Sequence, residues 1–140
     1  MKQAIATLCA SVALIGAAQV AVAHDTSTPT TVELRGTEQV PPGTYRAYGD
    51  LLTTKKCRVN RRAKIFFNYV VTGRGATGTP EWTLVDVDTS SRNGMWAGSG
   101  DLNMTTGGVN RVKIRATRKN VGRPGHRHIC RADTEIVLLP

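Results

Sequence analysis

The chain has 140 residues, of which 40% are hydrophobic and 21% charged, and its formal net charge is +9. Such a length accommodates one domain of ordinary size, and the apolar fraction is too high for wholesale disorder. Length and composition therefore disfavour a large enzyme, a multi-domain receptor and a polytopic membrane protein. Because aromatic residues make up only 5% of the chain, the predicted core depends on valine, leucine, isoleucine and two tryptophans.

Residues 1–23 resemble a secretory signal peptide. Lys2 supplies the positive start, residues 5–20 form an apolar stretch, and residues 21–23 form an A-x-A cleavage motif. A membrane anchor is the alternative, but the strongly apolar part is shorter than the ~20 residues that a spanning helix needs. We therefore expect cleavage after Ala23, a mature chain without a transmembrane segment, and a secreted or periplasmic location.

Cleavage of the signal changes both the charge and the cysteine count. Loss of Lys2 lowers the net charge by one from +9, and loss of Cys9 leaves Cys57 and Cys130 of the three cysteines. An even pair in an exported protein predicts one disulfide, with two buried free thiols as the alternative. The bond would contribute on the order of 4 kcal/mol to stability in the chain-entropy model.

The mature chain begins with residues 24–31 (HDTSTPTT), which lack periodicity and predict a flexible lead-in to a domain over residues 32–140. Short strand-like runs follow, separated by clusters of glycine, proline and asparagine. They lie at residues 32–34, 45–54, 59–72, 82–88, 111–116 and 129–139. No long helical pattern follows the signal. The expected fold is therefore a single antiparallel β-sandwich of about seven strands.

Two of these runs predict which side chains face the core. Residues 111–116 alternate between basic and apolar side chains, so the apolar ones should face inward. The predicted inward set is Val112, Ile114 and Ala116, and the predicted outward set is Arg111, Lys113 and Arg115. Residues 82–88 should place Thr83, Val85 and Val87 on one face, and Asp86 and Asp88 on the other. Asn93-Gly94 then predicts a hairpin turn.

Three short motifs are better explained as local structure than as functional sites. Residues 73–78 satisfy G-x-G-x-x-G, but no helix pattern follows to hold a dinucleotide, so we expect a loop between strands. Residues 86–94 resemble part of a calcium loop, yet Ala97 stands where the bidentate glutamate belongs. Residues 103–105 form a glycosylation sequon. No nucleophile–histidine set or carboxylate pair points to catalysis, so we expect no catalytic residue and no enzymatic activity.

The three histidines suggest a metal site as an alternative function. Cleavage after Ala23 would leave His24 at the mature N-terminus, where an amine and an imidazole together can chelate Cu(II). His126 and His128 place two more imidazoles on one side of an extended segment. Small exported copper-binding β-barrels resemble this chain in having an N-terminal histidine. The alternative is thus an exported copper-binding protein, and incidental histidines in a basic turn are the simpler explanation.

Basic residues are the most widespread feature of the sequence, and they are concentrated in two segments, residues 55–64 and residues 111–131. If the sheets bring these segments together, their surface would attract an anionic extracellular or envelope polymer. The residues predicted to bind it are Arg58, Arg61, Arg62, Lys64, Arg111, Lys113, Arg115, Arg118 and Lys119. A soluble cationic surface with charged strand edges would explain the same pattern. An inert structural or adhesive domain that contacts another protein is a further alternative.

Five segments, at residues 48–57, 61–66, 89–96, 112–116 and 130–133, carry a resemblance that spans residues 33–139. They are similar to small secreted bacterial β-sandwich domains of the transthyretin-like or carboxypeptidase-regulatory-like kind. Residues 89–96 (TSSRNGMW) match the group's T-x-x-x-x-G-x-W hairpin, and Cys57 and Cys130 are the most specific element. Ser91 departs from the acidic residue common in that hairpin, residues 73–80 give a looser middle, and the C-terminal Tyr-Arg-Gly-Ser motif of the enzyme members is absent. The resemblance implies an Ig-like or transthyretin-like sandwich with one disulfide, and it carries over no catalytic residue.

Overall fold

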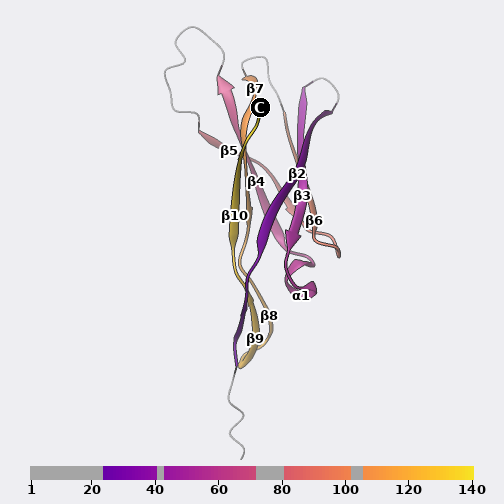
Figure 1. Ribbon diagram of the computed structural model, residues 1–140, viewed down its shortest axis with the longest axis vertical. Coiled ribbons are helices and arrows are strands. Elements are labelled where there is room, and N and C mark those ends of the chain that lie inside the picture. Colours follow the sequence, from indigo (N-terminus) through magenta and orange to yellow (C-terminus); the bar gives the residue numbers. More distant parts are fainter. Residues whose placement is uncertain (1–23, 41–42, 72–80, 102–105) are drawn as a thin grey trace, which may run out of the picture.

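The computed structural model describes residues 24–40, 43–71, 81–101 and 106–140. The predicted signal peptide, the glycine motif at residues 73–78 and the sequon at residues 103–105 lie outside these ranges. Within them the chain forms ten strands and one helical turn (Figure 1). The strands are β1 (Thr26–Thr28), β2 (Thr31–Val40), β3 (Thr44–Leu52), β4 (Arg62–Val71), β5 (Trp82–Thr89), β6 (Met95–Asp101), β7 (Thr106–Ala116), β8 (Lys119–Arg123), β9 (His126–Cys130) and β10 (Asp133–Leu138), and the helical turn is α1 (Lys55–Arg58).

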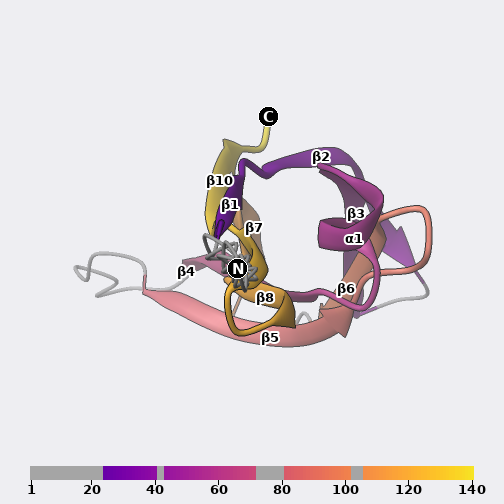
Figure 2. The same ribbon diagram turned by 90° about the horizontal axis from the view of Figure 1, so that it is seen from below.

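The prediction of an all-β fold is confirmed, and the strands belong to three sheets. One sheet has the order β10-β7-β4-β5 and a second has the order β2-β3-β6, and both are antiparallel throughout. The third sheet, β1-β9-β8, is mixed because β1 runs parallel to β9, and it lies at the lower end of the molecule in Figure 1. Seen along the long axis, the strands of the two larger sheets surround a common interior (Figure 2).

The hydrophobic core lies between the two larger sheets. Its members are Val32, Ala47, Leu51, Ala63, Ile65, Phe67, Trp96, Val112, Ile114 and Ala116. The inward set predicted for residues 111–116 is confirmed, since Val112, Ile114 and Ala116 are each 0% exposed. Strict alternation in β7 therefore places its basic side chains on the outer face of the four-stranded sheet.

The strand count exceeds the predicted seven because three elements differ from expectation. The expected lead-in at residues 24–31 contains β1, which pairs with β9 from Thr26 to Thr28. The run predicted at residues 129–139 is divided into β9 and β10, because the chain changes sheets at Arg131 and Ala132. Strand β8 has no counterpart among the predicted runs, and β6 is implied only as the strand that follows the Asn93-Gly94 turn. The fold is thus ten strands in three sheets with one helical turn, within the described ranges.

The turn predicted at Asn93-Gly94 forms, but it does not close a hairpin. Gly94 donates its N–H to the Ser91 carbonyl over 2.9 Å, and its φ of 89° is a conformation that favours glycine. The strands on either side of the turn, β5 and β6, belong to different sheets. Because turn chemistry is local, the Asn-Gly pair predicts the bend but not the pairing partner of the strand that follows.

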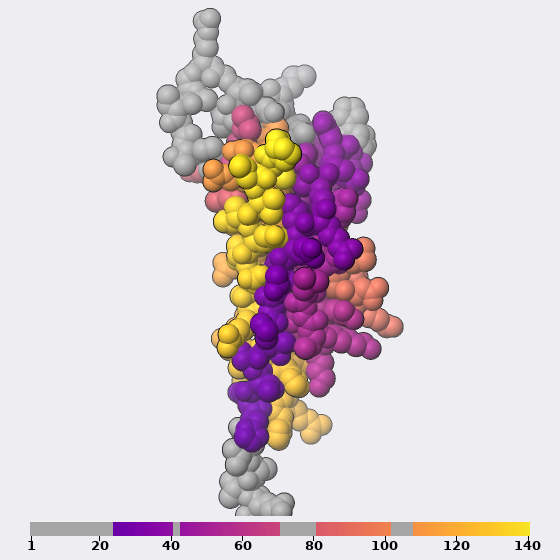
Figure 3. All heavy atoms as spheres, viewed as in Figure 1, coloured from indigo at the N-terminus to yellow at the C-terminus, as the bar shows by residue number. Residues whose placement is uncertain are grey.

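Carboxylates join the edges of the two larger sheets on one side of the molecule. Asp133 and Glu135 of β10 accept hydrogen bonds from the backbone N–H groups of Val32 (2.8 Å) and Leu34 (2.6 Å) in β2. Figure 3 shows β10, in yellow, and β2, in indigo, in contact along this side. The carboxylates take the place of the carbonyls that a neighbouring strand would supply, so these two N–H groups at the edge of β2 have partners.

A second pair of carboxylates joins the opposite edges in the same way. Asp88 and Asp86 of β5 accept hydrogen bonds from the N–H groups of Ala97 (2.8 Å) and Ser99 (3.2 Å) in β6. The same arrangement thus occurs at both edges: two acidic residues, with one residue between them, on an edge strand of the four-stranded sheet bind backbone N–H groups of the neighbouring sheet. We call these two edges the carboxylate seams.

The face pattern predicted for residues 82–88 is wrong, and a β-bulge is the reason. Ile65 of β4 pairs with Asp86 and Phe66 pairs with Leu84, so Val85 has no partner on β4. The extra residue shifts the alternation. Val85 packs against the core, whereas Val87 lies on the outer face and is 37% exposed.

Removal of the first carboxylate seam is expected to destabilise the protein. In the double variant Asp133→Ala/Glu135→Ala, two backbone N–H groups of β2 lose their partners, which should lower the free energy of unfolding by about 2–4 kcal/mol. Urea denaturation measures this loss. The control is Thr134→Ala, whose side chain lies on the same strand but faces solvent, and it should cost less than about 1 kcal/mol. Equal losses in the two proteins would show that the seam contributes nothing specific.

Candidate functional site

The outer face of the four-stranded sheet collects basic side chains from its two central strands. In the antiparallel register of β4 and β7, Lys64 lies opposite Arg115 and Phe66 lies opposite Lys113. The alternation that buries Ala63, Ile65 and Phe67 in β4 turns the residues between them outward. We use the name cationic face for the outward basic side chains of these strands: Arg62, Lys64, Arg111, Lys113 and Arg115.

Two aromatic rings hold the central lysine of the cationic face. The Nζ atom of Lys113 lies 4.6 Å from the ring centre of Phe66 and 4.4 Å from that of Trp82. Phe66 is opposite Lys113 on β4, and Trp82 belongs to β5. Each such cation–π contact contributes about 0.5–1 kcal/mol at an exposed site. The ammonium group is therefore held in place at the middle of the face.

The acidic residues of the same sheet are turned away from the cationic face. In the described residues of β4, β5, β7 and β10, the carboxylates are Asp86, Asp88, Asp133 and Glu135, and all four bind backbone N–H groups at the seams. No acidic side chain in this part of the chain is therefore positioned to neutralise the five basic ones. The outward field of the face is positive and open to an anion.

Arg61, which the sequence placed among the polymer-binding residues, is buried and does not belong to this face. It is 1% exposed. Its guanidinium donates hydrogen bonds to the Thr30 hydroxyl (2.6 Å) and to the carbonyls of Thr117 (2.7 Å), Cys57 (3.5 Å), Cys130 (3.4 Å) and Arg131. An arginine has five N–H donors, and these five acceptors use them all. Arg61 is therefore unavailable to a polymer.

The Arg61 guanidinium instead organises the region around the disulfide. The predicted bond between Cys57 and Cys130 is present, with their Cα atoms 5.4 Å apart. Burial lowers the pKa of Arg61 from its ordinary value, and the charge of Asp133 acts in the opposite direction. Since arginine remains protonated in proteins, its charge persists inside the fold. We call Arg61 and its acceptors the Arg61 cluster.

Three other basic residues predicted to bind the polymer lie apart from the cationic face. Arg58 is half-buried in α1, and Lys119, at the start of β8, donates from Nζ to the carbonyl of Val59. Arg118 is exposed between β7 and β8. The structure thus brings five of the nine predicted residues onto one sheet face and leaves the others in or near the connections around α1 and β8.

The structure places two of the three histidines on β9. The two ring nitrogens of His128 lie 3.3 Å from the Thr26 hydroxyl and 3.2 Å from Nζ of Lys56. His126 and His24 are exposed. Among residues 24–40, 43–71, 81–101 and 106–140, no group of three His, Cys, Asp or Glu side chains could hold a metal ion. Copper binding by His24, His126 and His128 stays a prediction of the sequence, and the ammonium group beside His128 would oppose a bound cation.

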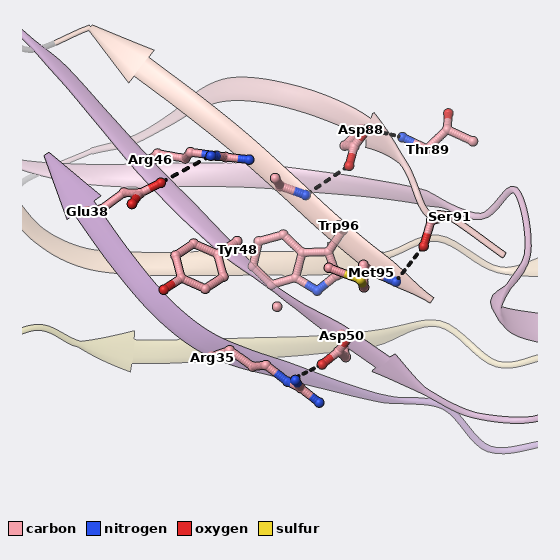
Figure 4. A pocket seen from close by; sticks show the side chains of 12 residues that line it. Arg35, Glu38, Arg46, Tyr48, Asp50, Asp88, Thr89, Ser91, Met95 and Trp96 are labelled. Atoms are coloured by element: carbon pink, nitrogen blue, oxygen red, sulfur yellow. Dashed lines mark hydrogen bonds and ion pairs between the residues drawn. The ribbon is translucent and has the colours of Figure 1, made fainter. Parts of the chain in front are cut away.

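A pocket of about 410 Å³ lies at the other large sheet. Its lining residues are Arg35, Glu38, Arg46, Tyr48, Gly49, Asp50, Asp88, Thr89, Ser91, Met95, Trp96 and Ala97 (Figure 4). Arg35 pairs with Asp50, and Arg46 lies 3.1 Å from Glu38. With each guanidinium already paired to a carboxylate, and with Asp88 adding a third negative charge, this pocket does not favour an anion.

The side chain of Tyr48, which lines the pocket, explains why position 36 of β2 is a glycine. A Cβ atom at Gly36 would lie 2.6 Å from the Tyr48 hydroxyl oxygen, so the tyrosine side chain covers the position that a larger residue would need. Trp96 is 2% exposed, and its indole nitrogen has no hydrogen-bond partner among the described residues. With two arginines and three carboxylates in its lining, the pocket differs in charge from the cationic face.

The aromatic side chains around Lys113 belong to the candidate site but were not among the residues predicted from the sequence. Arg62, Lys64 and Phe66 alternate along one run, so the period of two could have placed Phe66 beside the basic residues. No comparable signal was available for Trp82, because its contact with Lys113 depends on how β4 lies between β5 and β7.

Comparisons with known proteins give no family for this chain. No protein-family model, no curated protein and no solved structure matches it. Within the described residues, no helix has the length and apolar character that crossing a membrane requires. The chain is therefore identified here at the level of its architecture, a mostly-β domain with several sheets and one disulfide.

Proposed function

We propose that this protein is a non-enzymatic exported module that binds an anionic extracellular or envelope polymer through the cationic face. The observation that carries the proposal is the gathering of five basic side chains on two adjacent strands, with the acids of the same sheet turned into the seams. Export is predicted by the signal sequence, and a sandwich of the Ig-like or transthyretin-like kind remains our interpretation of the sequence resemblance.

The geometry of β7 suits a linear polyanion. Alternate residues on a strand are about 6.6 Å apart on one face, so Arg111, Lys113 and Arg115 form a row roughly 13 Å long. Lys64 and Arg62 broaden this row on β4. Because the aromatic rings already hold Lys113, little side-chain entropy would be lost there on binding. A polymer with anionic groups along its length could contact several of these residues at once.

Chromatography on immobilised heparin or teichoic acid tests the proposal. The protein should elute at higher salt than a neutral protein of similar size, because several ion pairs must be screened together. The variant Arg111→Gln/Arg115→Gln should elute clearly earlier. Its matched control is Arg46→Gln/Arg92→Gln, which removes the same charge from exposed positions away from the cationic face.

Two results would reject the proposal. One is retention of the unmodified protein no greater than that of the neutral protein, which would favour an inert structural or adhesive domain. The other is an equal shift in elution for the two double variants, because net charge alone would then explain retention. A larger shift for the Arg111 and Arg115 variant supports binding by the face itself.

A further inference from the structure

Exposed aliphatic side chains border the cationic face on both sides. On β10, Ile136 is 56% and Leu138 is 65% exposed, and on β5, Leu84 is 48% and Val87 is 37% exposed. The register places Ile136 beside Lys113 and Leu138 beside Arg111, while Leu84 pairs with Phe66 and Val87 with Lys64. The row through Lys113 and Phe66 thus has a cation and an aromatic ring at its centre and apolar side chains at both edges. The row through Arg115 and Lys64 has an apolar edge on β5 only, because Thr134 lies beside Arg115 on β10.

This border holds much of the exposed apolar surface of the described residues. The four residues account for half of the exposed large hydrophobic side chains in the described part of the chain; the others are Tyr48, Leu52, Val70 and Met95. Single exposed apolar residues are ordinary, but these four lie in two neighbouring pairs, one on each edge strand, with the cationic face between them. The face therefore offers two kinds of contact, ionic at the centre and apolar at the edges.

The charge of the face restricts what can cover it. A second copy of the chain, docked face to face, would bring two sets of five cations together with no carboxylate between them, and like charges at that distance repel. A purely hydrophilic polyanion would pair with the basic side chains of the cationic face but would leave the aliphatic side chains on β5 and β10 exposed to water. The complementary occupant carries negative charge and apolar chains in the same molecule.

We propose that the bound polymer is acylated, that is, an anionic glycolipid whose charged groups lie along β4 and β7 while its acyl chains contact the aliphatic borders on β5 and β10. The inference rests on the proposed function and names the chemical class of its ligand. Partial burial of these aliphatic side chains against acyl chains would strengthen binding roughly tenfold or more over the same polymer without them.

The test measures binding of lipoteichoic acid and of its deacylated form to the protein and to two variants. Ile136→Ser/Leu138→Ser removes the border on β10. The matched control is Leu52→Ser/Met95→Ser, which changes two residues of similar exposure, 50% and 59%, on the other large sheet. Intact lipoteichoic acid forms micelles that present many charges at once, so the comparison between the two variants is decisive, and their folding is verified by urea denaturation.

The unmodified protein and the control should bind the acylated form at least about tenfold more tightly than the deacylated form. The Ile136 and Leu138 variant should lose most of this preference and keep its affinity for the deacylated polymer.

Equal preference for the acylated form in both variants, or no such preference in the unmodified protein, overturns the inference and leaves the proposed function standing. Failure to bind either form overturns the proposed function itself. Equally tight binding to phosphatidylglycerol vesicles, which lack the polymer, would assign the face to an anionic membrane surface and reject an acylated polymer.

Discussion

Replacement of Arg61 by methionine is expected to lower the free energy of unfolding by about 3–5 kcal/mol, the cost of breaking a buried charged network by removing one partner. Methionine fills similar space but donates no hydrogen bond. The Thr30 hydroxyl and the carbonyl groups of the Arg61 cluster would then be buried without the donor that now satisfies them. Urea denaturation, followed by circular dichroism, measures the loss.

The neighbouring residue supplies a matched control. Arg62 is exposed and belongs to the cationic face, so Arg62→Met should change stability by no more than about 0.5 kcal/mol. The same substitution should weaken retention on heparin. A comparable loss of stability in both variants would show that the Arg61 cluster has no special structural role. If Arg61→Met remains folded, its heparin retention should match that of the unmodified protein, apart from the effect of net charge.

Removal of the disulfide is expected to have an effect of similar size. The double variant Cys57→Ala/Cys130→Ala should lose about 4 kcal/mol of stability, because the sequence separation of 73 residues closes a long loop in the unfolded chain. The measurement is the midpoint of urea unfolding, compared with that of the unmodified protein under reducing and oxidising conditions. Reducing agent should destabilise the unmodified protein and leave the alanine variant unchanged.

The two contributions should not be independent. The guanidinium of Arg61 binds the carbonyls of both bridged cysteines, so a change in one disturbs the other. A double-mutant cycle should show coupling of at least about 0.5 kcal/mol, with the combined variant losing less than the sum of the separate losses. Strict additivity would mean that the disulfide and the Arg61 cluster stabilise separate parts of the fold.

Local sequence patterns predicted the features that depend on one strand at a time. The alternation in residues 111–116 was sufficient to place Val112, Ile114 and Ala116 inside, because a strand reverses its side chains at every residue. The cysteine count predicted the bond between Cys57 and Cys130 once the signal was recognised. The Asn-Gly pair likewise predicted the turn before β6. Ten strands in three sheets were not predicted, since the pairing of strands is decided by partners distant in the chain.

The amino-acid sequence alone predicts a basic, disulfide-bonded, all-β chain in which residues 111–116 present cations on one side. Only the folded chain shows that β7 lies beside β4, so that Arg115 joins Arg62 and Lys64 on the outer face. It also shows that Arg61 is enclosed by carbonyl groups from β9 and the adjoining connections. A period of two already separates Arg61, which is in phase with Ala63 and Ile65, from Arg62, but it does not show that Arg61 finds acceptors in the interior. Alternation along the strand turns Arg61 and Arg62 to opposite sides. Packing of the fold then leaves Arg62 in contact with solvent and surrounds Arg61 with buried hydrogen-bond acceptors, which a buried charge requires.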